Sequence, residues 1–319
     1  MKQYCDISLD GMTALVKESK KRGNPAFFVS PFARNIAWAF FSCKIFLSGK
    51  ITASELARVF IDGKKEGLVK KKVKELSEQE LLSLFKGCAP RLTVGNMSVV
   101  PHNTSIAGLI DFLTLLQQII VDDQYHAREF LTSDSIVIDA GANIGTFTVF
   151  AASIAEKGKV YAFEPGAPAR ATLIENVRNA TNVSVVPFGL GEKSDSREMR
   201  VNAEFPGFSA FSDTGFAATG GISDVVLETV KIVTIDDFVK ENALPSVDFI
   251  KMDTEGYEKN IIRGARETIK RFKPVIAASA YHYPNDKIDI PALIQEIEPG
   301  YRHILSHRAE EDFIFWLPR

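Results

Sequence analysis

A glycine-rich turn holds the residues whose types and spacing point most directly to chemistry. Asp139 stands two residues before Gly141, and Asn143 and Gly145 complete a Gly-x-Asn-x-Gly pattern between a β-branched run and an apolar helical run. Glycines in such a turn let the backbone approach a ligand without a Cβ clash. A carboxylate at Asp139 would repel a pyrophosphate but would help hold an ammonium group, directly or through water. The turn therefore favours S-adenosylmethionine over a dinucleotide, which uses Gly-x-Gly-x-x-Gly; a tight turn without ligand is the plain alternative.

Two further segments fit the other parts of such a cofactor. Glu164 lies 25 residues after Asp139 at the end of a second apolar run, where an acidic side chain can accept hydrogen bonds from both ribose hydroxyls. A third run ends at Phe188, Gly189 and Leu190, and a backbone and an apolar wall at this place commonly enclose an adenine. Phe188 and Leu190 are equally compatible with the core.

The fourth run, VDFIKMD, places Asp253 and Glu255 at the same predicted edge. Asp253 is predicted to orient the sulfonium end of the cofactor or the acceptor. Glu255 is predicted to contact the cofactor, although Glu255 and Glu258 also suit the first turn of a helix, where the helix dipole favours acids. Tyr125, just upstream of the first run, is predicted to close over the cofactor, with a core tyrosine as the alternative.

His282, at the end of the fifth run, is the candidate general base. An imidazole titrates near neutrality and can take a hydroxyl proton, and Asp286 is placed to orient it. A structural histidine is the alternative. No histidine and carboxylate residues have a spacing that predicts a metal site, although Asp253, Glu255 and His282 can converge in space.

Elements that alternate between strands and helices must position these residues. From residue 134 onward, strands are predicted at 135–140, 159–164, 183–188, 247–253, 274–281, 301–307 and 312–317. Helices are predicted between most of them, at 146–155, 167–180, 256–272 and 291–297. This alternation indicates a mainly parallel sheet covered on both faces. The last two strands are joined too tightly for a helical crossover and should be antiparallel. The predicted fold class is α/β: a Rossmann-like methyltransferase fold with a mainly parallel seven-stranded sheet and an antiparallel closing strand.

Residues 191–232 interrupt this alternation. GEKSDSREMRVN and LETVKIV are candidate strands, and Phe208 to Ile222 between them is rich in Gly, Ala, Ser and Phe. A long irregular insert in a compact domain is usually functional or disordered. Because it follows the third strand, we interpret it as a candidate substrate lid, with a plain surface excursion as the alternative.

Residues 1–120 are predicted to form a mainly helical N-terminal region, and residues 121–319 the Rossmann-like domain. Thr52-x-x-Glu55 and Ser77-x-x-Glu80 are capping-box patterns. Ile106, Leu109, Ile110, Leu113 and Ile120 fall on one helical face. Three roles stay open for this region: gripping the acceptor, forming a homodimer, or capping the cofactor.

Composition restricts the partners. The 319 residues carry a formal net charge of -2, so no global basic field attracts nucleic acid. Three widely spaced cysteines argue against a disulfide framework and favour a reducing, cytoplasmic setting. The apolar stretch Ile36 to Leu47 is too short to span a bilayer, and we expect no stable membrane insertion. The N-terminus lacks the apolar core of a signal peptide.

The residues from about 121 to 319 resemble the FkbM family of methyltransferases. The matching pieces are IVIDAGANIGTFT (136–148), YAFEPGAPARATLIENV (161–177), VKIVTIDDFV (230–239), VDFIKMDTEGYEKNIIRGA (247–265) and AYHYPNDKIDIPALI (280–294). The resemblance implies S-adenosylmethionine-dependent O-methylation, often of sugars or secondary metabolites. It carries over the cofactor roles of Asp139, Gly141, Asn143, Gly145 and Glu164. Asp253, Glu255 and His282 match strand-end positions of the family without assigned individual roles.

The predicted function is thus methyl transfer from S-adenosylmethionine to a hydroxyl of a small-molecule or glycan acceptor. Three alternatives remain at this point. They are methyl transfer to nitrogen or carbon on the same fold, a non-catalytic protein that keeps the cofactor pocket, and an NAD-dependent oxidoreductase. The position of Asp139 disfavours the last of these, and the polar residues at the strand ends disfavour the second.

Overall fold

The computed structural model describes residues 4–8, 89–103, 106–202, 207, 209–212 and 225–318. Contacts between Cα atoms divide the chain into two compact units, one formed by residues 1–94 with 98–122, the other by residues 95–97 with 123–319. The division lies close to the predicted boundary at residue 120. The role of the N-terminal region remains a prediction.

In the described part of the N-terminal region, a three-stranded sheet has the order β1 (Tyr4–Ser8), β2 (Ala89–Val94), β3 (Met97–Val99). The mainly helical prediction missed these strands. Leu92, Val94, Met97 and Val99 are buried and flank Gly95 and Asn96, a period-two pattern that indicates strands around a turn. The helix predicted from Ile106 is present as α7 (Ile106–Leu115), continued by the π-helical turn η2 (Leu116–Val121). The helices predicted after Thr52 and Ser77, and the apolar stretch 36–47, lie outside the described residues.

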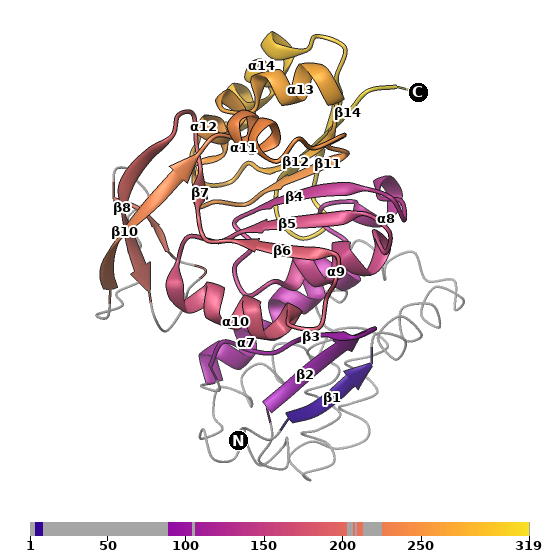
Figure 1. Ribbon diagram of the computed structural model, residues 1–319, viewed down its shortest axis with the longest axis vertical. Helices are drawn as coiled ribbons and strands as arrows, with labels where there is room; N and C mark the ends of the chain where they lie inside the picture. The colour runs from indigo at the N-terminus through magenta and orange to yellow at the C-terminus, as the bar shows by residue number, and fades with distance from the viewer. Residues whose placement is uncertain are drawn as a thin grey trace, which may run out of the picture. The chain divides into compact units, whose positions relative to one another are not determined.

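The second unit contains the predicted seven-stranded sheet, in the order β13-β14-β12-β11-β4-β5-β6 (Figure 1). The strands are β4 (Ile136–Ala140), β5 (Lys159–Phe163), β6 (Val183–Val186), β11 (Phe249–Met252), β12 (Val275–Ser279), β13 (Arg302–Ser306) and β14 (Asp312–Trp316). From β6 to β12 every pairing is parallel, whereas β14 is antiparallel to both neighbours. The predicted fold class is therefore confirmed.

Buried apolar residues hold this sheet between helices. Val137 and Ile138 of β4 and Phe249 and Ile250 of β11 are fully buried, as strands covered on both faces require. The helices are α8 (Ala127–Phe130), α9 (Thr146–Ile154), α10 (Ala167–Val177), α11 (Ile235–Glu241), α12 (Glu258–Arg263), α13 (Arg266–Phe272) and α14 (Asp286–Ile297). The single helix predicted over 256–272 is two, with Gly264 and Ala265 between them, and α14 begins five residues before the predicted start at 291.

The insert after the third strand builds a second sheet in the order β7-β10-β8-β9. Its strands are β7 (Gly189–Leu190), β8 (Asp195–Asn202), β9 (Ala210–Phe211) and β10 (Val225–Val233). The two predicted strands of the insert are thus confirmed. Most of the predicted lid lies outside the described residues, so the lid stays a prediction. Among the described helices, none is both long enough and apolar enough to span a membrane.

The strand order places a crevice where ligands bind in this class of sheet. β5 pairs with one edge of β4, and β11 pairs with the other edge. The chain therefore builds the sheet outward from β4 on one side through β5 and on the other side through β11. The space beyond the carboxyl ends of β4 and β11 is the topological switch point, where open α/β sheets bind ligands.

Candidate functional site

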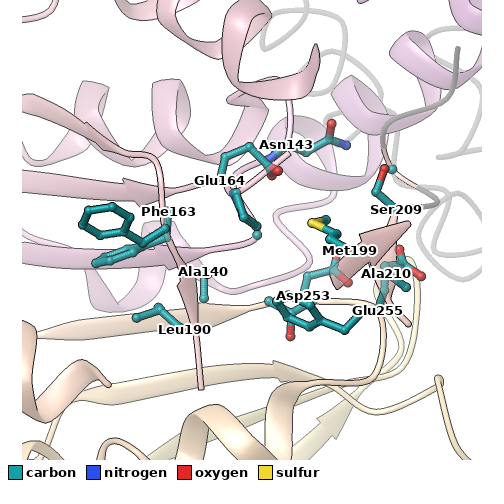
Figure 2. A pocket seen from close by; sticks show the side chains of 17 residues that line it. Ala140, Asn143, Phe163, Glu164, Leu190, Met199, Ser209, Ala210, Asp253 and Glu255 are labelled. Atoms are coloured by element: carbon teal, nitrogen blue, oxygen red, sulfur yellow. The ribbon is translucent and has the colours of Figure 1, made fainter. Parts of the chain in front are cut away.

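A pocket that is partly open to solvent lies at this switch point (Figure 2). The ends of β4, β5 and β11 form its floor, and β7, β8 and β9 of the second sheet contribute walls. The lining residues are Ala140, Gly141, Asn143, Phe163, Glu164, Pro165, Phe188, Gly189, Leu190, Met199, Gly207, Ser209, Ala210, Phe211, Asp253, Thr254 and Glu255.

Gly141 is required at the bend after β4. Its φ is +73°, and a Cβ added there would lie 2.0 Å from the carbonyl oxygen of Asp253. The backbone N–H groups of Gly141 and Ala142 donate to the carbonyl of Phe163 at 3.1 and 3.0 Å. The turn is thereby pressed between the ends of β5 and β11, which explains the first glycine of the motif.

Asn143 and Glu164 are joined by a direct hydrogen bond. The backbone N–H of Asn143 donates to Oε2 of Glu164 at 2.8 Å, and the N–H of Gly166 donates to Oε1 at 2.8 Å. Burial raises the pKa of Glu164 to about 7, although these hydrogen bonds act to lower it. The carboxylate is fixed in the pocket wall with lone pairs left for a hydroxyl donor.

The pocket has an apolar end, and the predicted adenine contact there stays a prediction. Gly189 and Leu190 line it together with Phe188 and Phe163. Gly145, in contrast, is not among the lining residues. It begins α9 with a φ of +92°, and a Cβ there would lie 2.5 Å from Leu173. Its glycine serves the packing of the helix rather than direct contact with a ligand.

Asp139, predicted to help hold an ammonium directly or through water, lies behind the pocket lining. Asp139 is fully buried and does not line the pocket. Its Oδ2 accepts a hydrogen bond from the Thr148 hydroxyl at 2.6 Å, and its Oδ1 lies 3.2 Å from Nζ of Lys251. The charge of the Asp139 carboxylate is thus balanced by Lys251, and the carboxylate supports the glycine turn from within the core.

Lys251 is the residue that the sequence reasoning missed. Its Nζ donates to the carbonyl of Gly141 at 2.7 Å and to that of Ala140 at 3.3 Å, and its side chain is 4% exposed. A lysine inside the apolar run VDFIKMD was the available signal, since a charge in a buried strand is almost always paired. Asp139 and Lys251 together hold the glycine turn.

Asp253 lies in the pocket wall, held by two tyrosines. The hydroxyl of Tyr125 donates to Oδ2 at 2.9 Å, and that of Tyr281 donates to Oδ1 at 3.1 Å. Burial by itself would raise the pKa of Asp253, but the charges of Lys251 and His282 and these hydrogen bonds outweigh it and lower the pKa. Asp253 therefore presents an ionised carboxylate to the pocket at neutral pH.

Tyr125, predicted to close over the cofactor, is a buried tyrosine in this structure, which is the alternative that the sequence left open. Tyr125 is 1% exposed, does not line the pocket, and packs edge-to-face on Phe147 with ring centroids 5.3 Å apart. Its hydroxyl is what reaches the site, through Asp253.

His282 lies beside Asp253 and Glu255 but is not among the residues that line the pocket. Its side chain is 0% exposed, with Nε2 3.8 Å from Asp253 and 3.7 Å from Glu255, and Nδ1 3.5 Å from Glu258. Burial alone would lower the pKa of His282, but contact with Glu258 and the charges of all three carboxylates raise it to about 9. A protonated imidazole does not favour the predicted role of general base at neutral pH, and that role stays a prediction. The carboxylate of Asp286 accepts from the N–H of Tyr283 at 2.8 Å and lies 3.0 Å from Nζ of Lys259.

The same cluster contains the donors that could hold a metal ion. Asp253, Glu258 and His282 offer one ligand atom each within 4.8 Å of one another. Glu258 is the first residue of α12 and is buried. Its carboxylate accepts hydrogen bonds from the N–H and the hydroxyl of Thr254 at 2.7 and 2.9 Å. The sequence reasoning named Glu255 in its place, and the absence of a metal remains a prediction.

Glu255 reaches the pocket on a loop in an uncommon conformation, with a φ of +53°. Burial, together with the nearby charge of Asp253, raises its pKa from 4.5 to about 8, against the opposing charge of His282. A cation bound beside the carboxylate would favour its ionised form.

The raised pKa of Glu255 gives a pH dependence of stability. The folded protein holds the proton on the Glu255 carboxyl more tightly than the unfolded chain does. The contribution of this proton to the free energy of unfolding is therefore complete below about pH 4.5 and is lost as the pH rises through 8. Relative to the Glu255→Gln variant, we expect the wild type to lose at most about 1.4 kcal/mol per pH unit in this window. Denaturant unfolding of both proteins without ligand from pH 5 to 9 measures the difference. The exposed Glu241→Gln substitution is the control, and a difference independent of pH would contradict the prediction.

Comparisons with known proteins agree with this geometry. A family model described as the methyltransferase FkbM domain matches residues 139–313, more than half of the chain. The hexuronic acid methyltransferase AglP of Haloferax volcanii is 25% identical over 236 residues, which cover 73% of this chain and 87% of AglP. The AMB antimetabolite synthetase AmbE of Pseudomonas aeruginosa is 28% identical over 201 residues, which are 52% of this chain but only 9% of AmbE.

A solved structure titled methyltransferase FkbM, from Methylobacillus flagellatus KT, aligns with a TM-score of 0.44 and 22% identity. The alignment covers 65% of this chain and 54% of that one. The family match spans the glycine turn, Glu164, the strand end with Asp253 and Glu255, and His282. The chain therefore belongs to the FkbM methyltransferase domain family.

Proposed function

We propose that the protein transfers a methyl group from S-adenosylmethionine to a hydroxyl of a small-molecule or glycan acceptor, such as a sugar or a secondary metabolite. The observation that carries the proposal is the pocket itself, which joins an apolar end at Phe163, Phe188 and Leu190 to the fixed carboxylate of Glu164 and then to Asp253 and Glu255. Family membership supports the methyltransferase class, and the likeness to AglP supports a sugar acceptor.

The residues present fit this cofactor in its separate parts. The apolar end suits an adenine, and Glu164 suits the ribose hydroxyls because its carboxylate is held by two backbone N–H groups and faces the pocket. The close approach of the Gly141 backbone, with Asp253 and Glu255 beside it, suits the cationic methionine end. When bound, the cofactor supplies an electrophilic methyl group on a sulfonium, which is a good leaving group.

The protein's own part in the reaction is mainly positioning. Asp253, ionised and held by Tyr125 and Tyr281, accepts a hydrogen bond from the acceptor hydroxyl and turns its oxygen toward the methyl group. The proton passes to a pocket carboxylate or to water. His282 is a positioning residue that keeps Asp253 and Glu255 in place from behind. The described part of the insert, Ser209 to Phe211, limits access of water from the other side.

Binding of S-adenosylhomocysteine, measured by isothermal titration, tests the cofactor. The wild type should bind it saturably, and Glu164→Ala should weaken binding about 100-fold, because two hydrogen bonds to the ribose and the support of the Asn143 N–H are lost. Glu175→Ala, an exposed glutamate on α10, is the matched control and should bind like the wild type. Equal binding by the wild type and Glu164→Ala would remove Glu164 from the site.

Transfer itself is tested with methyl-labelled cofactor and a panel of sugars and secondary metabolites. NMR of the labelled product identifies the atom that carries the methyl group. A methyl ether supports the proposal, whereas label on nitrogen or carbon would correct the reaction class. Tight binding of NAD in place of S-adenosylhomocysteine would overturn it.

A further inference from the structure

Tyr281 is an exposed tyrosine just past the carboxyl end of β12. Within the described residues, it is the one Phe, Tyr or Trp side chain among the exposed large apolar groups, and it is 37% exposed. Its chain neighbours Ala280 and His282 are both buried. The ring therefore faces solvent at the edge of the sheet where ligands bind, and tyrosine is a residue type that often contributes strongly to binding.

The Tyr281 ring is fixed at its hydroxyl and along one side. The hydroxyl donates to Oδ1 of Asp253 at 3.1 Å. The ring centroid lies 4.3 Å from that of His282, with 41° between the two planes. Because the side toward His282 is covered, the exposed part of the ring is the part turned away from it. A tyrosine held in this way loses little further conformational freedom when a ligand packs against it.

Hydrogen-bond acceptors border this ring. Burial raises the pKa of Tyr281, and the charges of Asp253 and Glu310 raise it further, which places both carboxylates near the ring. A carboxylate accepts hydrogen bonds and donates none. An apolar ring surface bordered by such acceptors suits a ligand that has an apolar C–H face and several hydroxyl donors.

Asp253 connects this ring to the pocket. Asp253 lines the pocket at the end away from Phe163 and Leu190 (Figure 2), whereas Tyr281 is not among the lining residues. A molecule that packs on Tyr281 and donates to Asp253 would thus lie next to the pocket at this end. In the proposed function, the methionine part of the cofactor lies at the same end, so this place is suited to the acceptor.

We propose that Tyr281 is the platform on which the ring of a neutral sugar acceptor packs, with the hydroxyl to be methylated donating to Asp253. The proposal rests on the proposed function and specifies its acceptor. In the transfer, the hydroxyl oxygen bonds to the methyl carbon as the carbon–sulfur bond breaks, and its proton passes to a pocket carboxylate or to water. An acceptor with its own carboxylate would bring like charges together beside Asp253 and Glu310 and should bind more weakly.

Saturation-transfer NMR of the full-length protein, saturated with S-adenosylhomocysteine, tests the platform. The probes are the methyl glycosides of glucose, galactose, mannose and rhamnose, with methyl glucuronide as the charged comparison. At least one neutral glycoside should bind the wild type saturably and more tightly than methyl glucuronide does. Tyr281→Ala should weaken this binding about tenfold. Tyr281→Leu, which keeps apolar volume without a flat ring, should do the same, whereas Tyr281→Phe should largely retain binding.

Isothermal titration with S-adenosylhomocysteine is the second measurement on the same variants. Its affinity should change little, because Tyr281 does not line the pocket. A merely structural role would instead weaken the binding of cofactor and glycoside together. Ile288→Ala, which removes an exposed apolar side chain from α14, is the control and should behave as wild type in both measurements.

The outcomes separate this proposal from the proposed function. Equal glycoside binding by the wild type and Tyr281→Ala, or equal loss in Tyr281→Phe and Tyr281→Ala, would overturn the platform. Tighter binding of methyl glucuronide than of every neutral glycoside would also overturn it. If no glycoside binds but a non-sugar hydroxyl is methylated, the platform is wrong and the proposed function stands. Failure of the wild type to bind S-adenosylhomocysteine would contradict the proposed function itself.

Discussion

Replacing Lys251 by methionine is expected to lower the free energy of unfolding by about 3–5 kcal/mol. The substitution keeps most of the side-chain volume but leaves the fully buried Asp139 carboxylate without its cation. It also removes the hydrogen bonds to the carbonyls of Ala140 and Gly141. Denaturant unfolding followed by circular dichroism measures the loss, and cofactor binding should weaken along with it because the glycine turn loses its support.

A double variant separates the buried charge from the lost hydrogen bonds. In Lys251→Met with Asp139→Asn, the amide still accepts from Thr148 and no charge remains buried, so most of the stability should return. Cofactor affinity should recover less, since the Gly141 carbonyl still has no Lys251 donor. A Lys251→Met variant within 1 kcal/mol of wild type would show that the pair does not support the turn.

Gly141→Ala is expected to have the second large effect, with a loss of stability of about 2–4 kcal/mol and loss of measurable cofactor binding. The new Cβ would meet the Asp253 carbonyl oxygen at 2.0 Å and would also strain a φ of +73°. Since the oxygen belongs to the backbone, the end of β11 must move, and Asp253 and Glu255 move with it. Thermal unfolding and titration with S-adenosylhomocysteine measure the two effects.

Gly95→Ala is the control for backbone strain without a clash. Gly95 has a φ of +58°, but a Cβ there would meet nothing within 4 Å. We expect a cost of about 1 kcal/mol and normal cofactor binding. If Gly141→Ala is no worse than Gly95→Ala, then the close approach of the turn and β11 does not matter to the site.

Local patterns in the sequence were enough to predict the frame of the site. The alternation of short apolar runs with helices predicted the seven strands and the antiparallel closing pair, because period and connection length are properties of neighbouring residues. Gly141, Asn143 and Glu164 were also predictable, since a strand-to-helix turn needs glycine and the end of the next parallel strand always lies beside it. The strands of residues 89–99 were missed, although their alternation around Gly95 and Asn96 was visible.

The partners of the charged residues depended on the tertiary structure. Tyr125 donates to Asp253 across 128 positions of sequence, and Lys251 reaches the turn after β4 across more than 100. His282 looked like a neutral base in the sequence, but Asp253 and Glu255 of the loop after β11 and Glu258 at the start of α12 lie around it and raise its pKa. A side chain's protonation and partners follow from burial and from charges brought close by folding, and spacing along the chain contains neither.

The sequence by itself therefore determined which segments along the chain form strands, where the glycine turn lies and which acidic residues stand at the strand ends. Short-range sterics and periodicity dictate these features. Only the tertiary structure decided that Asp139 is fully buried outside the pocket lining, that Lys251 balances its charge, and that His282 lies among three carboxylates. These are long-range electrostatic relations, which exist only once β4, β11 and the loops after β11 and β12 have been packed side by side.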